Sequence, residues 1–229
     1  YSILASGAFL PAINLFKYIT FRSIMALLTS FLISLWATPR VIRLLKELYP
    51  KGQPIRQSGP EKHITDKKGT PTMGGLIIIA SMMISVFLWT NLMNPYIWIT
   101  TFVTVSFSLL GFTDDYLKVS RGSHNGIRGK AKLVVQALVS VVACFAVQKY
   151  SAPQYLSHVT IPFFKNIVID LGYFYMAFVM FVIVGASNAV NLTDGLDGLV
   201  TVPIVIVAMC FAVICYLVGN YVFANYLQL

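Results

Sequence analysis

Two adjacent carboxylates, Asp114 and Asp115, follow an uncharged apolar run over 95–113, and Lys118 comes one helical turn later. Neighbouring residues of an α-helix point about 100° apart, so we expect the two acids to have different partners and different roles. Mg²⁺ prefers oxygen ligands, takes one or two carboxylates, and completes its shell with water and substrate phosphates. The motif therefore suits a magnesium-dependent phosphate site. The alternative is a helix end at which the acids simply meet water.

A second polar cluster, within residues 188–199, also lies between uncharged runs. It repeats an amide or a carboxylate at every third position, at Asn188, Asn191, Asp194 and Asp197. On a helix each of these side chains would drift about 60° from the last, and Gly195 and Gly198 favour a helix end. The pattern predicts a helix that opens into a polar loop at a membrane surface. Two acidic corners of this kind suggest one site.

Two basic segments could supply positive charge to such a site. Residues 67–75 place two lysines before small residues, whose backbone amides can approach an anion near the start of a helix. Residues 120–132 are basic and contain several glycines, which also suits phosphate contact. Both segments fit equally well the excess of Lys and Arg in the cytoplasmic loops of membrane proteins.

The composition identifies the elements that must position these residues. Of the 229 residues 57% are hydrophobic and 11% are charged, with a mean hydropathy of +0.76, whereas soluble globular proteins have about 25% charged residues. We therefore predict an all-α integral membrane protein, a polytopic helical bundle that forms a single transmembrane domain over 1–229. The predicted transmembrane helices are the apolar runs 23–39, 72–90, 95–113, 133–148, 171–190 and 199–219. Residues 152–172 predict a short external β-hairpin.

The net charge of +9 could indicate nucleic-acid binding, but the location of the 17 Lys and Arg residues argues against it. Eight lie within 40–68 and five within 118–132, whereas the links 91–94 and 219–229 carry none. This asymmetry follows the positive-inside rule and predicts that both acidic motifs are cytoplasmic. The stretch 40–48 alternates apolar and basic residues at helical spacing, which predicts an ordinary helix end whose long side chains reach the membrane surface; the alternative is an arm that binds anionic lipid headgroups. The three cysteines and three histidines suggest neither a disulfide nor a metal site.

Three motifs in this order, at 68–75, 114–118 and 188–199, resemble the polyprenyl-phosphate N-acetylhexosamine 1-phosphate transferase superfamily. Within it they are most similar to the phospho-N-acetylmuramoyl-pentapeptide transferases, the MraY family. The motifs read Lys-Gly-Thr-Pro-Thr-Met-Gly-Gly, Asp-Asp-Tyr-Leu-Lys and Asn-Ala-Val-Asn-Leu-Thr-Asp-Gly-Leu-Asp-Gly-Leu. The resemblance covers essentially the whole chain. It implies a ten-helix homodimer in the bacterial cytoplasmic (inner) membrane, with the active site on the cytoplasmic face.

The same resemblance implies a reaction and a set of site residues. The reaction is transfer of phospho-MurNAc-pentapeptide from UDP-MurNAc-pentapeptide to undecaprenyl phosphate, with Mg²⁺ as cofactor and lipid I and UMP as products. Catalytic positions would be Asp114, Asp115 and Lys118, with Asp115 as a metal ligand. Substrate-binding positions would be Lys67, Thr72, Lys130, Asn191, Asp194 and Asp197. One-step transfer and a covalent two-step mechanism both remain open.

Compared with that family, the chain has no counterpart of the last four helices, of a third aspartate that would be the principal Mg²⁺ ligand, or of a histidine-rich cytoplasmic loop. The chain alone is therefore expected to be an incomplete catalyst. One alternative function is an ion-coupled transporter, although its acids should lie in mid-span rather than after uncharged runs. Another is a related transferase that acts on a different UDP-sugar. A prenyl-transferring enzyme with an Asp-Asp-x-x-Asp motif is disfavoured because Lys118 takes the place of the third acid.

Overall fold

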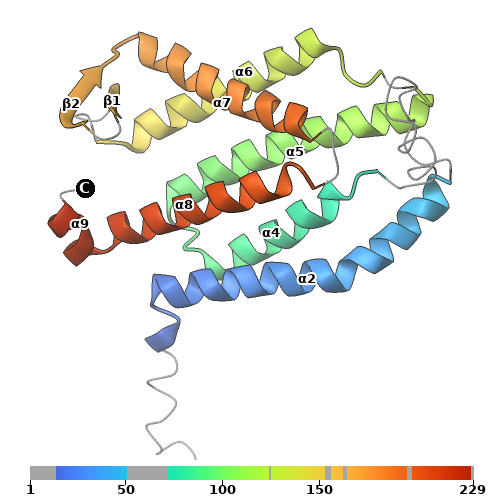
Figure 1. The fold of residues 1–229 in the computed structure, drawn as a ribbon, viewed down its shortest axis with the longest axis horizontal. Helices are drawn as coiled ribbons and strands as arrows, with labels where there is room; N and C mark the ends of the chain where they lie inside the picture. The colour runs from blue at the N-terminus through green and yellow to red at the C-terminus, as the bar shows by residue number, and fades with distance from the viewer. Residues whose placement is uncertain are drawn as a thin grey trace, which may run out of the picture. The chain divides into compact units, whose positions relative to one another are not determined.

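The computed structural model describes residues 14–50, 72–123, 125–152, 156–161, 164–194 and 198–227. These residues form helices and one two-stranded sheet (Figure 1). In chain order the elements are α2 (Ile19–Leu48), α4 (Gly75–Trp89), α5 (Pro95–Arg121), α6 (Gly129–Tyr150), β1 (His158–Ile161), β2 (Phe164–Asp170), α7 (Phe174–Thr193), α8 (Thr201–Gly219) and α9 (Tyr221–Leu227). The chain divides into two compact units, Tyr1–Met180 and Phe181–Leu229, with the boundary inside α7.

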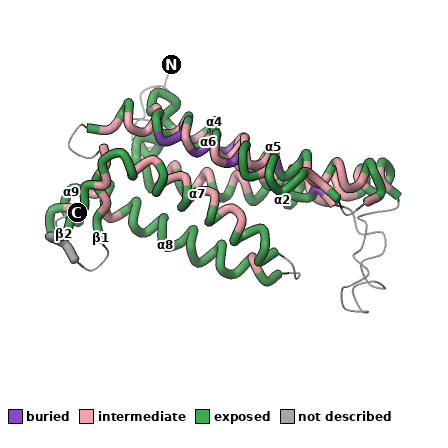
Figure 2. Tube along the Cα trace, turned by 90° about the horizontal axis from the view of Figure 1, so that it is seen from above, coloured by how far each residue is buried: buried purple, intermediate pink, exposed green. Residues whose placement is uncertain are grey.

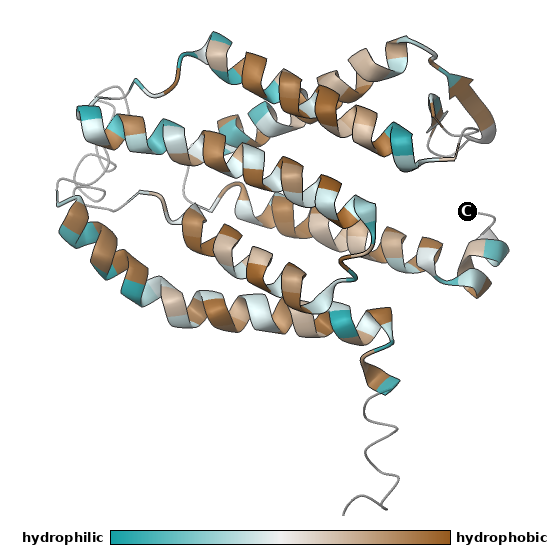
Figure 3. Cartoon of the chain, turned by 180° about the vertical axis from the view of Figure 1, so that it is seen from behind, coloured by the Kyte–Doolittle hydropathy of each residue, from teal (hydrophilic) through white to brown (hydrophobic). Residues whose placement is uncertain are grey.

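Five helices are long and apolar enough to cross a membrane, namely α2, α5, α6, α7 and α8. Figure 3 shows the helices largely in the colours of hydrophobic residues, with hydrophilic residues near several helix ends. The prediction of an all-α, multi-pass membrane protein is confirmed. The short hairpin predicted within 152–172 is present as β1 and β2.

The second predicted span, over 72–90, is shorter than expected. Its helix, α4, contains 15 residues and begins only at Gly75, which corresponds to about 22 Å along the helix axis. Met73 has a φ of 70°, a left-handed conformation that an α-helix cannot accommodate. Thr72 and Met73 therefore precede the helix, and α4 is apolar but too short to be grouped with the other five spans.

The first span is longer than the predicted 23–39. The α2 helix has 30 residues and contains Pro39 in its interior. Proline removes one backbone hydrogen bond of a helix. On either side of Pro39, polar side chains of α2 donate hydrogen bonds to backbone carbonyls of the same helix. Thr38 Oγ1 donates to the Ser34 carbonyl at 2.6 Å, and Arg43 Nε donates to the Pro39 carbonyl at 3.3 Å. The helix thus continues beyond the proline through the basic stretch, as predicted.

The α2 and α4 helices are neighbours that meet through hydroxyl groups. Ser34 Oγ and Ser81 Oγ lie 2.7 Å apart, and Trp89 Nε1 donates to Thr29 Oγ1 at 3.0 Å. Ser81 is 1% exposed, and Ser85 Oγ donates to its carbonyl at 2.9 Å. Small residues let membrane helices approach closely, and hydrogen bonds between such helices contribute about 0.6–2 kcal/mol each.

The buried residues of the described chain lie on α4, α5 and α6 or immediately before α4 (Figure 2). They are the apolar Met73, Ile77, Leu110, Ala143 and Cys144 and the polar Ser81, Ser85, Gln136 and Ser140. The α4 helix neighbours α5, and α5 neighbours α6. This row of helices fixes α5, which carries the double aspartate.

The hairpin pairs β1 with β2 in an antiparallel arrangement that sets His158 opposite Asp170. The Ser157 hydroxyl donates to Asp170 Oδ1, and the Gly172 backbone N–H donates to the same oxygen at 2.9 Å. The Ser157 hydrogen bond and then the Gly172 bond hold the pKa of Asp170 below its usual value, because both favour the charged form. The carboxylate therefore ties the two ends of the hairpin together.

The second unit contains the last part of α7 with α8 and α9. The α7 helix ends at Thr193, close to the predicted end of the fifth span. The Asp194 N–H still donates to the Val190 carbonyl at 3.1 Å, as the last helical hydrogen bond of this segment. Asn220 separates α8 from α9, and its side chain accepts a hydrogen bond from the Val222 N–H at 3.0 Å.

Candidate active site

The double aspartate lies on α5, about two turns before the helix ends. Lys118 Nζ lies 2.6 Å from Asp114 Oδ2 and 3.4 Å from Asp115 Oδ1. One ammonium group thus serves two carboxylates at spacings that face each other on a helix. Two neighbouring carboxylates repel each other, and the shared lysine offsets this repulsion.

The two carboxylates have different second partners. Asp114 Oδ1 accepts a hydrogen bond from the backbone N–H of Ile127 at 2.7 Å. Asp115 Oδ2 accepts one from the Thr72 hydroxyl at 3.3 Å. The Asp114 side chain is 16% exposed and that of Asp115 is 36% exposed. Asp114 is therefore held on both oxygens by short contacts, whereas Asp115 is held loosely and is more open to solvent.

The left-handed backbone at Met73 places Thr72. This conformation costs a non-glycine residue about 1–2 kcal/mol, yet the Met73 side chain is 8% exposed and therefore well packed. The Leu76 N–H donates to the Met73 carbonyl at 3.1 Å, which turns the chain into α4. Thr72 is left ahead of the helix, with its hydroxyl against α5. Strained backbone of this kind is often found at functional sites.

The segment after α5 folds back onto the acid pair. Gly122 ends the helix with a φ of 59°, and the Ser123 N–H donates to the Lys118 carbonyl at 3.1 Å. Glycine is favoured at such a left-handed helix end. Gly126 then passes so close to Asp114 that a Cβ atom at this position would lie 2.1 Å from Oδ1. The backbone of the segment therefore rests directly on the carboxylate.

The first turn of α6 brings two lysines near this segment. Lys130 is the second residue of α6 and is exposed. Lys132 follows within the same turn, and its charge acts on Asp114. Both lysines come within five residues of Ile127, whose backbone N–H contacts Asp114.

The structure thus brings four of the predicted site residues together: Thr72, Asp114, Asp115 and Lys118. Asn191 and Asp194 are exposed at the end of α7 in the second unit. Lys67 and Asp197 lie outside the described residues.

Comparison of the sequence with known proteins assigns the chain to a family. The profile described as glycosyl transferase family 4 matches residues 97–228, which is more than half of the chain and includes the double aspartate. The chain belongs to glycosyl transferase family 4. Phospho-N-acetylmuramoyl-pentapeptide-transferase signature 1 matches residues 67–79, which include Thr72 and Met73.

Curated relatives with the name phospho-N-acetylmuramoyl-pentapeptide-transferase are about half identical to this family 4 chain. The protein of Rickettsia montanensis is 54% identical over 217 residues, which cover 94% of this chain and 59% of the relative. The protein of Rickettsia felis gives the same values. That of Rickettsia prowazekii is 53% identical over 216 residues, again with 59% of its length covered. The chain therefore spans about three fifths of the length of these relatives.

Asp115 is the described carboxylate of this family 4 chain that best fits a magnesium ion. Among the described residues no three His, Cys, Asp or Glu side chains gather in one group. Mg²⁺ needs only one or two carboxylates when water and substrate phosphates supply the rest. Asp115 Oδ1 has a long contact of 3.4 Å with Lys118, so it can still accept a metal bond. Asp114 fits less well because both of its oxygens are already engaged.

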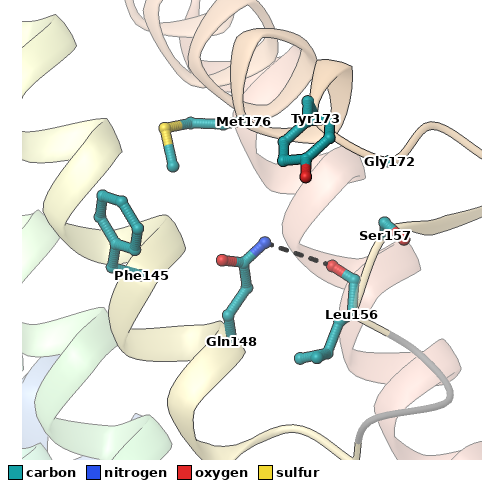
Figure 4. Close-up of a pocket in the computed structure, with 7 residues that line it drawn as sticks. All are labelled: Phe145, Gln148, Leu156, Ser157, Gly172, Tyr173 and Met176. Atoms are coloured by element: carbon teal, nitrogen blue, oxygen red, sulfur yellow. Dashed lines mark hydrogen bonds between the residues drawn. The ribbon is translucent and has the colours of Figure 1, made fainter.

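A cavity of about 530 Å³ lies at the other end of α6, between that helix, the hairpin and the start of α7 (Figure 4). Its described lining consists of Phe145, Gln148, Leu156, Ser157, Gly172, Tyr173 and Met176. Gln148 Nε2 donates to the Leu156 carbonyl at 3.4 Å across it. None of these lining residues is charged, so the described lining offers no charged side chain that could pair with a phosphate.

Two residues of the site, Gly126 and Ile127, were missed by the sequence reasoning. The segment 120–132 was recognised as basic and glycine-bearing, but nothing in its composition assigned it a partner. Ile127 acts through its backbone N–H, which every residue except proline possesses. A glycine placed beside an acidic motif could have suggested a close approach, without naming the carboxylate that it approaches.

Proposed function

We propose that the protein to which this chain belongs transfers phospho-MurNAc-pentapeptide from UDP-MurNAc-pentapeptide to undecaprenyl phosphate, giving lipid I and UMP in peptidoglycan synthesis. The observation that carries the proposal is the cluster of Thr72, Asp114, Asp115 and Lys118 near the end of an apolar helix. The sequence comparison supports the proposal, because this chain is about half identical to phospho-N-acetylmuramoyl-pentapeptide-transferases over nearly all of its own length.

The location of the cluster suits a reaction between a soluble nucleotide and a membrane lipid. An oxygen of the lipid phosphate forms a bond to the sugar-bound phosphorus, and the bond from that phosphorus to the UMP oxygen breaks. Reactions of this kind depend on positioning and on neutralising phosphate charge. A site near a helix end gives access to lipid phosphates at the membrane surface. An ion-coupled transporter would instead need acids in mid-span.

The described residues have separate roles at the phosphates of the two substrates. Lys118 keeps one positive charge between the two carboxylates and close to the arriving phosphate. The Thr72 hydroxyl orients Asp115, which would hold Mg²⁺. When bound, the ion supplies positive charge that neutralises the diphosphate.

The nucleotide end of the substrate is assigned to residues on three other segments. Lys130 offers an exposed ammonium group at the start of α6. Asn191 and Asp194 offer exposed hydrogen-bonding groups at the end of α7. In our proposal Lys67 and Asp197 complete the uridine and diphosphate pocket. The site faces the cytoplasm of a bacterial inner membrane, and the protein is a homodimer.

The test uses the full-length protein in membranes or detergent, with fluorescent UDP-MurNAc-pentapeptide and undecaprenyl phosphate. We expect lipid I and UMP in equal amounts, loss of both on chelation with EDTA, and recovery on addition of Mg²⁺. Absence of lipid I from a folded full-length protein would overturn the proposal.

A parallel reaction with UDP-N-acetylglucosamine separates this function from that of a related transferase. We expect no lipid-linked product from that sugar. Turnover of UDP-N-acetylglucosamine in preference to UDP-MurNAc-pentapeptide would assign the protein to another branch of the superfamily.

A further inference from the structure

Arg22 is a half-buried cation near the start of α2, and the described part of the chain offers it no counter-ion. Its Nε atom is buried and has no hydrogen-bond partner among the described residues. Lys17, five residues earlier, is exposed. Within the described ranges the ion pairs are those of Lys118 with the acid pair, Asp114 and Asp115. Moving a charge out of water without a partner is costly, so this guanidinium group indicates an anion from outside the described chain.

The acids of α2 and α5 lie far from Arg22 along their helices. Glu47 is 25 residues further along α2, which corresponds to about 38 Å. At the other end of α2, the ring of Phe21 contacts that of Trp89 at the end of α4. The α5 helix begins six residues after Trp89 and reaches the acid pair only after about five turns. Arg22 and the acid pair therefore lie at opposite ends of the helices.

Two other parts of the chain could have supplied a carboxylate. Asp170 lies on β2, in the hairpin that follows α6, and α4 and α5 lie between α2 and α6 in the row of helices (Figure 1). Its carboxylate already accepts hydrogen bonds from Ser157 and Gly172. Residues 1–13, which precede the described part of the chain, contain no Asp or Glu. The described residues of the first unit thus place two basic side chains at this end of α2 without an acid to pair with them.

The surface around Arg22 is apolar and exposed. The α2 helix has no buried residue, and Tyr18 and Ile24, on either side of Arg22 in the chain, are both exposed. The rings of Phe21 and Trp89, with centroids 6.3 Å apart, lie at the same end of α2. Trp and Tyr side chains are enriched where a membrane meets water. A ligand of Arg22 would therefore meet apolar surface as well as positive charge.

We propose that Arg22, together with Lys17, binds the phosphate group of an anionic phospholipid in the leaflet on the side of the membrane away from the acid pair. A guanidinium group can hold two phosphate oxygens at once, and the ammonium group of Lys17 adds a second charge at the membrane surface. The acyl chains of the lipid match the apolar surface of α2, whereas a free phosphate ion matches only the charge. The inference does not rest on the proposed function, because the lipid substrate is assigned to the other end of the helices.

The first test uses the full-length protein with Trp89 as its only tryptophan, in vesicles of phosphatidylcholine and phosphatidylglycerol. One of the two lipids carries bromine on its acyl chains, which quenches nearby tryptophan fluorescence. Quenching of Trp89 by each lipid in turn gives their relative affinity for this end of α2. We expect phosphatidylglycerol to be preferred about fivefold or more, as for basic side chains that attract an anionic lipid. Equal quenching by the two lipids overturns the proposal.

Arg22→Gln removes the charge and should lower this preference to about twofold or less. Arg22→Lys keeps the charge but cannot hold two oxygens in the same way, so we expect an intermediate preference. Arg40→Gln is the matched control, because it makes the same change further along the same helix, where the guanidinium group donates to the Trp36 carbonyl at 2.5 Å. It should leave the quenching of Trp89 unchanged. An unchanged preference in Arg22→Gln, or an equal loss in Arg40→Gln, overturns the proposal.

Lys17→Gln keeps the test decisive if Arg22→Gln fails to fold. Lys17 is exposed and precedes α2, so its replacement disturbs no packing within the described structure. We expect the preference for phosphatidylglycerol to fall by about twofold, since one of two charges is lost. If Arg22→Gln cannot be measured, an unchanged preference in Lys17→Gln overturns the proposal.

The second test separates a lipid from a free anion. Inorganic phosphate is added to the vesicles, with sodium chloride at the same ionic strength as the control. We expect both salts to weaken the preference equally, because each acts only by screening charge. A greater loss in phosphate would assign Arg22 to a free anion and overturn the proposal. A carboxylate from the part of the protein outside this chain would pair with Arg22 and abolish the wild-type preference in the first test, with the same consequence.

Discussion

The Thr72 hydroxyl lies 3.3 Å from Asp115 Oδ2 and joins two segments that are 43 residues apart in the chain. Thr72→Val keeps the size and branching of the side chain but removes this hydrogen bond. We expect kcat/KM to fall roughly tenfold, the lower range for a bond to a charged acceptor. Thr72→Ser keeps the hydroxyl and should stay within about threefold of wild type. Wild-type rates in Thr72→Val would show that Asp115 is oriented without it.

Asp115→Asn tests the carboxylate that is open to substrate. Because the change removes charge while keeping the shape, we expect kcat to fall by about a hundredfold or more at saturating substrates, as for an interaction made mainly in the transition state. The KM for the UDP-sugar should change much less. Initial rates across a Mg²⁺ series provide the measurement. Full activity in this variant would reduce the double aspartate to a polar helix end.

Orientation in the membrane is tested with Arg121, at the end of α5, and Tyr173, which is 102% exposed beside the hairpin. Single cysteines at these positions need a background without the three native cysteines. We expect a membrane-impermeant maleimide to label Tyr173→Cys in intact cells. Arg121→Cys should be labelled only after the membrane is opened, because basic loops stay in the cytoplasm. The reverse pattern would invert the predicted orientation.

The hairpin is expected to loosen in acid. Donors from Ser157 and Gly172 hold the pKa of Asp170 below its usual value of about 3.9. The stability that they contribute is therefore present above that value and is lost as the pH falls towards and through the lower folded-state pKa. Amide exchange of residues 157–172, corrected for its intrinsic pH dependence, should accelerate below about pH 4. Asp170→Asn should show no such step, and a step of equal size in that variant would exclude this carboxyl as the cause.

The hydroxyl contact between α2 and α4 makes a modest contribution to stability. Ser81→Ala removes a buried hydroxyl that lies 2.7 Å from Ser34. We expect a loss of about 1 kcal/mol in the free energy of unfolding, as for other hydrogen bonds between membrane helices. Ser120→Ala is the control, because that hydroxyl is exposed and contacts only its own helix. Equal unfolding of the two variants in a detergent titration would show that the Ser34 contact contributes nothing.

Hydropathy and charge predicted the helices well because each span is a local property of the chain. Apolar runs located α5 and α6, and the uncharged run over 95–113 placed the double aspartate in the last turns of its helix. The i,i+4 spacing also placed Lys118 beside Asp114. The start of α4 was misjudged, because the left-handed backbone of Met73 has no signal in a hydropathy pattern.

Contacts between distant segments could not be predicted in the same way. The Thr72–Asp115 and Ile127–Asp114 hydrogen bonds depend on how α4 and the end of α5 fold relative to their neighbours. The donors, Thr72 and Ile127, carry no charge that would indicate a pairing with an aspartate. The roles of Asn191 and Asp194 remain predictions from their spacing and from the family resemblance.

The short α4 also has a consequence for the surrounding lipid. Its length of about 22 Å falls short of a hydrocarbon core of about 30 Å. Such hydrophobic mismatch makes the bilayer thin locally or draws polar groups below the headgroup level, at a small cost per ångström. Thr72 lies just before this helix and contacts Asp115, so any thinning of the bilayer at this end of α4 would occur beside the acid pair. Shorter acyl chains would lower the mismatch beside the site, and thicker bilayers would raise it.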